Sequence, residues 1–198
     1  MGRLYNGKNF RYSGEKGFFM YEKKLRSMVF SALFAALIFL GVYIIHIPIP
    51  NGYLHFGDGL IYAAASLLPL PAAIAASAVG GALADLLSGF AIYAPITAVV
   101  KALMALAVSL IVKDNRFLAR LSGGEGTRGG FPAVLLAAAL AGAINVAGYF
   151  IAECFLYGAA GAAASLGGNA IQSAAGVAIY LLLLPLLARV MRALRGSE

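Results

Sequence analysis

The sequence predicts an all-α, polytopic membrane protein, a bundle of six transmembrane helices with the N- and C-termini on the cytoplasmic side. Hydrophobic residues make up 62% of the chain and charged residues only 12%, whereas soluble domains carry about 25% charged residues. The apolar residues also form long runs, as over residues 28–45 and 133–143. Because a bilayer core needs about 20 such residues per helix, these runs exclude a water-soluble enzyme.

Four of the spans follow directly from the apolar runs, at residues 25–45, 95–112, 132–155 and 169–189. The stretch 59–88 allows two interpretations. It is either one long helix kinked at Pro69 and Pro71, or two short helices joined by a turn at residues 68–71. The distribution of Lys and Arg distinguishes the two.

Short cytoplasmic loops collect Lys and Arg. Seven of the fifteen basic residues precede residue 27, and most of the others gather over residues 113–128 and 189–195. Five spans would place both later clusters outside. Six spans place all three clusters inside and leave three outer loops that contain no Lys or Arg, at residues 46–58, 89–94 and 158–168. We therefore predict six spans.

The second span, over residues 59–68, is too short to cross a membrane alone at ~1.5 Å per residue. It needs protein around its ends to satisfy the exposed backbone groups. The segment 1–24 is expected to be a disordered, basic cytoplasmic tail, residues 25–192 the transmembrane domain, and residues 193–198 a C-terminal tail.

The net charge of +7 comes mainly from basic residues that flank apolar spans. Basic residues in that position contact the anionic headgroups of the lipid bilayer, so nucleic acid is not an expected partner. The single cysteine, Cys154, excludes an internal disulfide and a cysteine-based metal cluster. We expect neither a metal site nor a cofactor.

The chain lacks the phosphate-binding motif G-x-x-x-x-G-K-[ST], so we do not expect it to hydrolyse ATP. The zinc-protease motif H-E-x-x-H and the serine-hydrolase motif G-x-S-x-G are also absent. No other catalytic constellation is recognisable. We predict that the protein is not an enzyme.

With six spans, the charged side chains in or bordering the membrane all fall in its outer half, at Asp58, Asp85, Lys101 and Glu153. A charge at mid-membrane costs about 2.5–3.5 kcal/mol, so such groups usually face protein or a wet cavity. Lys101 lies near enough to the outer surface for its long stem to reach outward. Asp85 and Lys101 either form a structural ion pair between the third and fourth helices or contact a ligand.

Polar residues spaced at three or four positions form stripes on the fourth, fifth and sixth helices. All three stripes open toward the outside, and the loop 46–58 is expected to cover them as a lid. Tyrosines offer stacking faces, and acid and amide groups offer directed hydrogen bonds, which together predict a small-molecule pocket. The candidate substrate-binding residues are Asn145, Tyr149, Glu153, Asn169, Gln172, Lys101, Thr97, Tyr93, Asp85, Tyr53 and His55.

Several of these residues also fit a structural role. Glu153 is close enough to the surface to lie in interfacial water, and Asn145 fits a hydrogen bond between helices. Asn169 and Gln172 fit a cap of the sixth helix, and His55 fits a structural role in its loop. Their common side of the membrane is the stronger argument for a pocket.

Small residues at intervals of four let membrane helices approach closely. The first helix carries Ala32 and Ala36 at this spacing, and the third carries Ala73, Ser77 and Gly81. Packing within the chain and docking to a partner both explain such patterns, and the sequence leaves the choice between them open.

Five motifs carry a resemblance to a known family. They are G-D-G at 57–59, G-G-A-L-A-D-L-L-S-G at 80–89, Y-A-P-I-T at 93–97 followed by Lys101, G-Y-F-I-A-E at 148–153 and G-N-A-I-Q at 168–172. Over residues 27–189 the chain resembles the substrate-binding S components of energy-coupling factor (ECF) vitamin transporters. The last two motifs are similar to the branch that includes riboflavin, pyridoxine and hydroxymethylpyrimidine carriers.

The resemblance implies a six-helix bundle in the plasma membrane of a prokaryote that captures a vitamin or vitamin precursor from outside. It implies as partners a transmembrane coupling protein and two cytoplasmic ATPases, with Ala32 and Ala36 as the docking surface. Glu153 and the amides favour a neutral or weakly basic ring, such as pyridoxine or hydroxymethylpyrimidine, and riboflavin stays an alternative. Two other functions are compatible with the residues: a stand-alone proton-coupled carrier using Asp85 or Glu153, and a non-transporting membrane scaffold.

Overall fold

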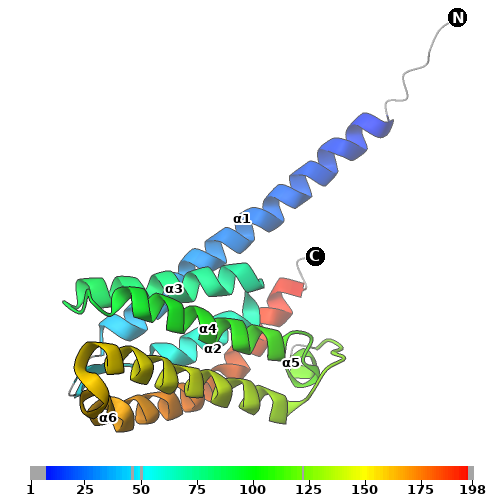
Figure 1. Cartoon of the computed structure of the whole chain (residues 1–198). Coiled ribbons are helices and arrows are strands. Elements are labelled where there is room, and N and C mark those ends of the chain that lie inside the picture. The colour runs from blue at the N-terminus through cyan, green and yellow to red at the C-terminus, as the bar shows by residue number, and fades with distance from the viewer. Residues whose placement is uncertain (1–7, 46, 50, 122, 196–198) are drawn as a thin grey trace, which may run out of the picture.

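The computed structural model describes residues 8–45, 47–49, 51–121 and 123–195. Helices dominate it, and a two-stranded hairpin lies between the first two (Figure 1). The elements in chain order are α1 (Lys8–Tyr43), β1 (Ile47–Ile49), β2 (Gly52–Leu54), α2 (Gly57–Leu67), α3 (Leu70–Leu87), α4 (Ala94–Val112), α5 (Arg116–Leu121) and α6 (Phe131–Arg195).

Helix α6 is 65 residues long and reverses direction at Gly158, whose backbone is not helical (φ 75°, ψ 170°). Figure 1 shows two antiparallel segments, which we call the first arm (residues 131–157) and the second arm (residues 159–195). The sequence predicted an outer loop over residues 158–168, and that prediction is wrong in its extent. The alanine-rich residues 159–164 favour helix, so a single glycine with a positive φ suffices for the turn.

Within the described part of the chain, four helices are long and apolar enough to cross a membrane, namely Lys24–Tyr43, Leu70–Leu87, Ala94–Val112 and Phe131–Ala193. The last of these includes both arms of α6 and therefore supplies two crossings. Helix α2 has only 11 residues and completes the set of six. The all-α, polytopic fold expected from the sequence is confirmed.

The short helix α2 is surrounded by the rest of the bundle. It packs against α1, α3, α4 and α6, and most of its side chains are buried, including the entire run Ile61–Ala65. Neighbouring protein therefore shields a helix that could not span a bilayer alone. The chain leaves α2 at Leu68, where the backbone is extended, and α3 starts with Pro71 in its first turn, as the prolines at 69 and 71 led us to expect.

The basic connections and the outer loops predicted from the sequence lie at opposite ends of the bundle (Figure 1). Figure 1 shows α5 and the C-terminus at one end and the turn between the arms of α6 at the other. The basic connection 113–130 lies at the first of these ends, which we call the basic end. The hairpin β1–β2 lies at the second, which we call the hairpin end. This is the arrangement that the distribution of Lys and Arg requires.

Helix α1 begins at Lys8, so it includes most of the segment that the sequence predicted to be a disordered tail over residues 1–24. No proline interrupts the chain between Lys8 and Tyr43, and the helix continues without a break. Residues 1–7 lie outside the described part. Helix α6 likewise continues to Arg195, into the predicted C-terminal tail, and residues 196–198 are not described.

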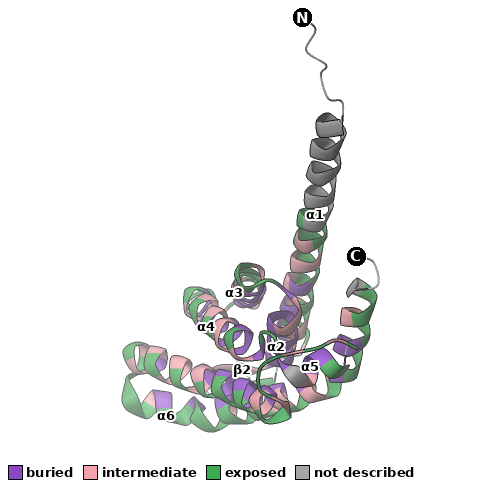
Figure 2. Cartoon of the chain, turned by 90° about the vertical axis from the view of Figure 1, so that its right-hand side faces the viewer, coloured by how far each residue is buried: buried purple, intermediate pink, exposed green. Residues whose placement is uncertain are grey.

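Figure 2 shows buried residues on the inward faces of the helices and exposed residues on the outward faces. The small residues of α3 serve intramolecular packing, since Ala73, Ser77 and Gly81 are all buried. Ala32 and Ala36 of α1 are exposed instead. The two small-residue patterns therefore have different surroundings, although the sequence presents them alike.

Helices α1 and α3 approach each other closely at Gly80. A Cβ atom on this glycine would lie 2.7 Å from the carbonyl oxygen of Ala35 and 3.0 Å from the Cβ of Ile38. We predict that Gly80→Val lowers the free energy of unfolding by about 1–3 kcal/mol, because overpacking at a backbone contact forces the helices apart. Thermal unfolding in detergent micelles measures the change.

Gly167→Ala is the matched control, because the position lies in the second arm of α6 and nothing is within 4 Å of its added Cβ. Alanine is favoured over glycine in a helix by about 1 kcal/mol, so this variant should be at least as stable as the wild type. A Gly80→Val protein with unchanged stability would contradict the packing of α1 against α3 described above.

Candidate functional site

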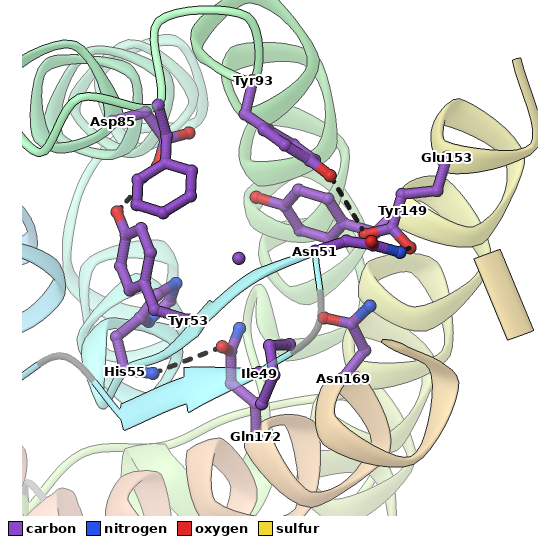
Figure 3. Close-up of a pocket in the computed structure, with 12 residues that line it drawn as sticks. Ile49, Asn51, Tyr53, His55, Asp85, Tyr93, Tyr149, Glu153, Asn169 and Gln172 are labelled. Carbon is purple, nitrogen blue, oxygen red and sulfur yellow. Dashed lines mark hydrogen bonds between the residues drawn. The ribbon is translucent and has the colours of Figure 1, made fainter. Parts of the chain in front are cut away.

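A pocket lies under the β1–β2 hairpin, between α3, α4 and both arms of α6 (Figure 3). Its lining combines acids, amides and aromatic rings. The lining residues are Ile49, Asn51, Gly52, Tyr53, His55, Asp85, Phe90, Tyr93, Tyr149, Glu153, Asn169 and Gln172. Side chains from segments more than 100 residues apart in the sequence therefore meet in one cavity.

The segment predicted as a lid is a β-hairpin. β1 and β2 pair antiparallel, with Ile47 opposite Leu54 and Ile49 opposite Gly52. The Asn51 amide at the tip donates to the carbonyl oxygen of Gly161 at 2.7 Å and to Glu153 Oε2 at 3.3 Å. These contacts hold the tip across the pocket against both arms of α6. His46 and Pro50 of this segment lie outside the described residues.

One wall of the pocket is built around Asp85 of α3. Its carboxylate accepts hydrogen bonds from the Tyr53 hydroxyl at 2.7 Å and from the Thr97 hydroxyl. The Thr97 hydroxyl also lies 2.7 Å from that of Tyr149. Burial, reinforced by the charge of Asp85, raises the pKa of Tyr53 above its ordinary value. Tyr53 therefore stays protonated and keeps donating to Asp85, which ties the hairpin to α3.

The opposite wall contains Glu153, Tyr93 and Tyr149, and Figure 3 shows these side chains facing Asp85 and Tyr53 across the cavity. The rings of Tyr93 and Tyr149 lie 6.3 Å apart, centre to centre. Glu153 is only 3% exposed, so it does not lie in interfacial water. Its contacts with Asn51 (3.3 Å) and with the Tyr93 hydroxyl (3.5 Å) are long for hydrogen bonds to a carboxylate. The carboxylate thus retains capacity to accept from a ligand.

Asn169 and Gln172 line the pocket from the second arm of α6. The alternative that they cap the sixth helix is wrong, because that arm is already helical from residue 159. The Gln172 carbonyl oxygen accepts from the backbone N–H of His55 at 3.3 Å. His55 itself is buried, and its Nδ1 accepts from the backbone N–H of Gly57 at 3.2 Å, a structural role that helps to connect the hairpin to α2.

Lys101 lies beneath the pocket and does not line it. Its ammonium is 2.6 Å from Asp58 Oδ1 and donates to Asn145 Oδ1 at 2.8 Å. The alternative of a structural ion pair between Asp85 and Lys101 is wrong in its acidic partner, because Asp58 of α2 pairs with the ammonium. The expected outward reach of Lys101 is wrong too, since the residue is 0% exposed.

Thr97 and Asn145 also belong to the layer under the pocket. Thr97 joins Asp85 to Tyr149. Asn145 bonds Lys101 and donates to the Ser173 hydroxyl at 3.2 Å, which agrees with the interpretation as a hydrogen bond between helices. The remaining predicted site residues all line the cavity.

Sequence reasoning missed four lining residues, Ile49, Asn51, Gly52 and Phe90. All four lie in the loops 46–58 and 89–94, which had been placed at the correct end of the bundle. A search that treated every polar and aromatic residue of these loops as a candidate would have found Asn51 and Phe90. The sequence does not identify Ile49 and Gly52 as lining residues, because their position at the pocket depends on the pairing of β1 with β2.

The chemistry of the cavity is that of a binding site. Among the described residues, no three His, Cys, Asp or Glu side chains are grouped so that they could hold a metal ion. The described lining residues include two carboxylates, from Asp85 and Glu153, and no Lys or Arg. Such a pocket can stack a planar ring on tyrosines and accept hydrogen bonds from its donors.

Comparison with known proteins gives two matches. Residues 22–189 match the family model described as "ECF-type riboflavin transporter, S component". An uncharacterized protein of Pyrococcus woesei is 33% identical over 139 residues, which cover 69% of this chain and 84% of the relative.

Proposed function

The chain belongs to the family of ECF-type riboflavin transporter S components, and we propose that it captures a planar, neutral or cationic heteroaromatic vitamin or vitamin precursor in the pocket under the hairpin. S components are substrate-binding subunits of membrane transporters and not enzymes. The observation that carries the proposal is the cavity, whose described lining combines two carboxylates, three amides and several aromatic rings and contains no Lys or Arg.

The charge of the lining selects among ligand classes. Glu153 is buried, and its two contacts are long, so a ligand N–H or cation would gain a charge-assisted hydrogen bond there. An anionic ligand such as a phosphate ester would face two carboxylates in a site of low dielectric constant. Unphosphorylated compounds are therefore the expected substrates.

The size of the pocket favours small ligands. The cavity under the hairpin has a volume of about 40 Å³, far below the range of about 300–1,000 Å³ for small-molecule sites, so the hairpin has to move for a ligand to enter. A single-ring compound such as pyridoxine or hydroxymethylpyrimidine requires a smaller movement than a flavin. Riboflavin, named in the family description, is the competing candidate, and a binding panel has to include all three compounds.

We place the hairpin end of the bundle on the outside of a prokaryotic plasma membrane and the basic end in the cytoplasm. The hairpin then acts as a lid that opens when Asn51 releases Gly161 and Tyr53 releases Asp85. Transport requires a transmembrane coupling protein and two cytoplasmic ATPases. The exposed Ala32 and Ala36 of α1 offer these partners a flat surface for a close helix contact.

We predict that Glu153→Ala weakens substrate binding by roughly 10- to 100-fold, because a hydrogen bond to a charged group is worth about 1.5–3 kcal/mol and about 1.4 kcal/mol corresponds to a factor of ten. Titration calorimetry on purified protein against riboflavin, pyridoxine and hydroxymethylpyrimidine measures the affinity. Glu125→Ala is the control, since this exposed acid lies in the connection at the basic end. Equal affinities in wild type and Glu153→Ala would remove Glu153 from the site.

We predict that Ala32→Leu and Ala36→Leu leave substrate affinity unchanged and abolish ATP-dependent uptake into vesicles that contain the coupling protein and ATPases. A leucine on this exposed face fills the space needed for close helix contact, whereas the pocket is at the hairpin end. Ala147→Leu is the control, because Ala147 is exposed on the first arm of α6. Normal uptake by both α1 variants would rule out this docking surface, and uptake without ATP or partners would favour the proton-coupled carrier.

A further inference from the structure

A cluster of four buried polar residues lies directly beneath the pocket, where α2, α4 and the two arms of α6 meet. The members are Asp58, Lys101, Asn145 and Gln172, and we call them the Asp58 cluster. Gln172 alone also lines the pocket. Asp58 and Lys101 are both 0% exposed, so they form a closed ion pair inside the membrane-spanning bundle.

The hydrogen bonds of the cluster form a continuous chain. Lys101 donates to Asp58 Oδ1 at 2.6 Å and to Asn145 Oδ1 at 2.8 Å. The second carboxylate oxygen of Asp58 accepts from Gln172 Nε2 at 3.0 Å. Both oxygens of Asp58 are therefore engaged, one by a cation and one by an amide that reaches up to the pocket.

Two pocket-lining side chains depend on this pair for their orientation. Since Gln172 Nε2 points down to Asp58, its Oε1 points to the hairpin and accepts from the backbone N–H of His55. The Lys101 ammonium lies 5.4 Å from the centre of the Tyr149 ring, a distance at which a cation attracts an aromatic face. The pair thus holds both an amide and a stacking face of the pocket.

Close glycine packing keeps Asp58 in place. A Cβ on Gly176 would lie 2.8 Å from the Cβ of Asp58, and a Cβ on Gly59 would lie 2.5 Å from Ile179 Cγ2. The start of α2 is therefore pressed against the second arm of α6. This packing restrains the backbone and Cβ of Asp58, and the ion pair with Lys101 holds its carboxylate.

We propose that Asp58 and Lys101 are a positioning pair: without touching the substrate, they fix Gln172 and Tyr149 in the binding geometry and link the pocket floor to the hairpin through the His55 amide. This inference depends on the proposed function only for the identity of the ligand. Removing one partner leaves a buried charge without compensation, and it frees the side chains that the pair had oriented.

The first experiment needs no ligand. Hydrogen exchange of the His55 amide is followed at single-residue resolution in detergent micelles by fragmentation mass spectrometry. Asp58→Asn and Gln172→Leu should each raise its exchange rate about tenfold, because the loss of about 1.4 kcal/mol of protection corresponds to that factor. Ser109→Ala is the control, since this α4 hydroxyl bonds Ala65 away from the pocket, and it should leave the rate unchanged.

The second experiment is a double-mutant cycle on substrate affinity with riboflavin, pyridoxine and hydroxymethylpyrimidine as probes. Asp58→Asn and Lys101→Met should each weaken binding at least about tenfold. The double variant has no uncompensated charge, so it should bind better than either single variant. If Asp58→Asn or Lys101→Met does not fold, the exchange rate of the His55 backbone amide in the other single variant and in Gln172→Leu still tests the proposal.

Unchanged exchange at His55 in a folded Asp58→Asn protein would overturn the proposal, and so would a double variant whose two losses simply add. If none of the three compounds binds the wild type, the proposed ligand class is wrong, whereas the exchange measurement still tests the positioning pair. The two failures are therefore distinguishable.

Discussion

A lysine inside a membrane-spanning bundle requires a counter-charge, and the contact between Lys101 and Asp58 meets this requirement. Either charge alone would cost several kcal/mol to bury. The pair is possible only because α2 begins within the bundle and presents Asp58 in its first turn, opposite α4. Asn145 and Gln172 each add one hydrogen bond, to Lys101 and to Asp58 respectively. The crossing of α2, α4 and both arms of α6 is thereby fixed, and the pocket is built on top of it.

The acidic side chains that line the pocket, above the pair of Asp58 and Lys101, have different hydrogen-bond partners. Asp85 accepts from two hydroxyl groups, and Glu153 has two long contacts. Among the described residues, no Lys or Arg lines the cavity. A structural core would satisfy its acids as fully as Asp58 is satisfied. Asp58 is held by an ion pair and an amide, whereas Glu153 has only two long contacts. This contrast is the physical basis for assigning ligand binding to the pocket above the ion pair.

The sequence predicted the fold through charge. The positions of Lys and Arg at the ends of spans predicted the number of membrane-spanning helices. The interval of four residues predicted that Tyr149 and Glu153 share one face of a helix, and both line the pocket. The partner of Lys101 was beyond such reasoning, because Asp58 lies 43 residues away on another helix and no sequence interval relates the two. The strand pairing within the lid and the restriction of the turn to Gly158 were missed for a similar reason, since strand pairing and a single positive φ leave no periodic signal.

Native mass spectrometry of the protein released from its membrane tests the central claim most directly. The account predicts one small molecule bound per chain, either copurified or added, that contains a heteroaromatic ring and carries no negative charge. Activation in the gas phase should release that molecule for identification. The absence of any adduct after incubation with riboflavin, pyridoxine and hydroxymethylpyrimidine, or an adduct that is a phosphorylated anion, would contradict the account.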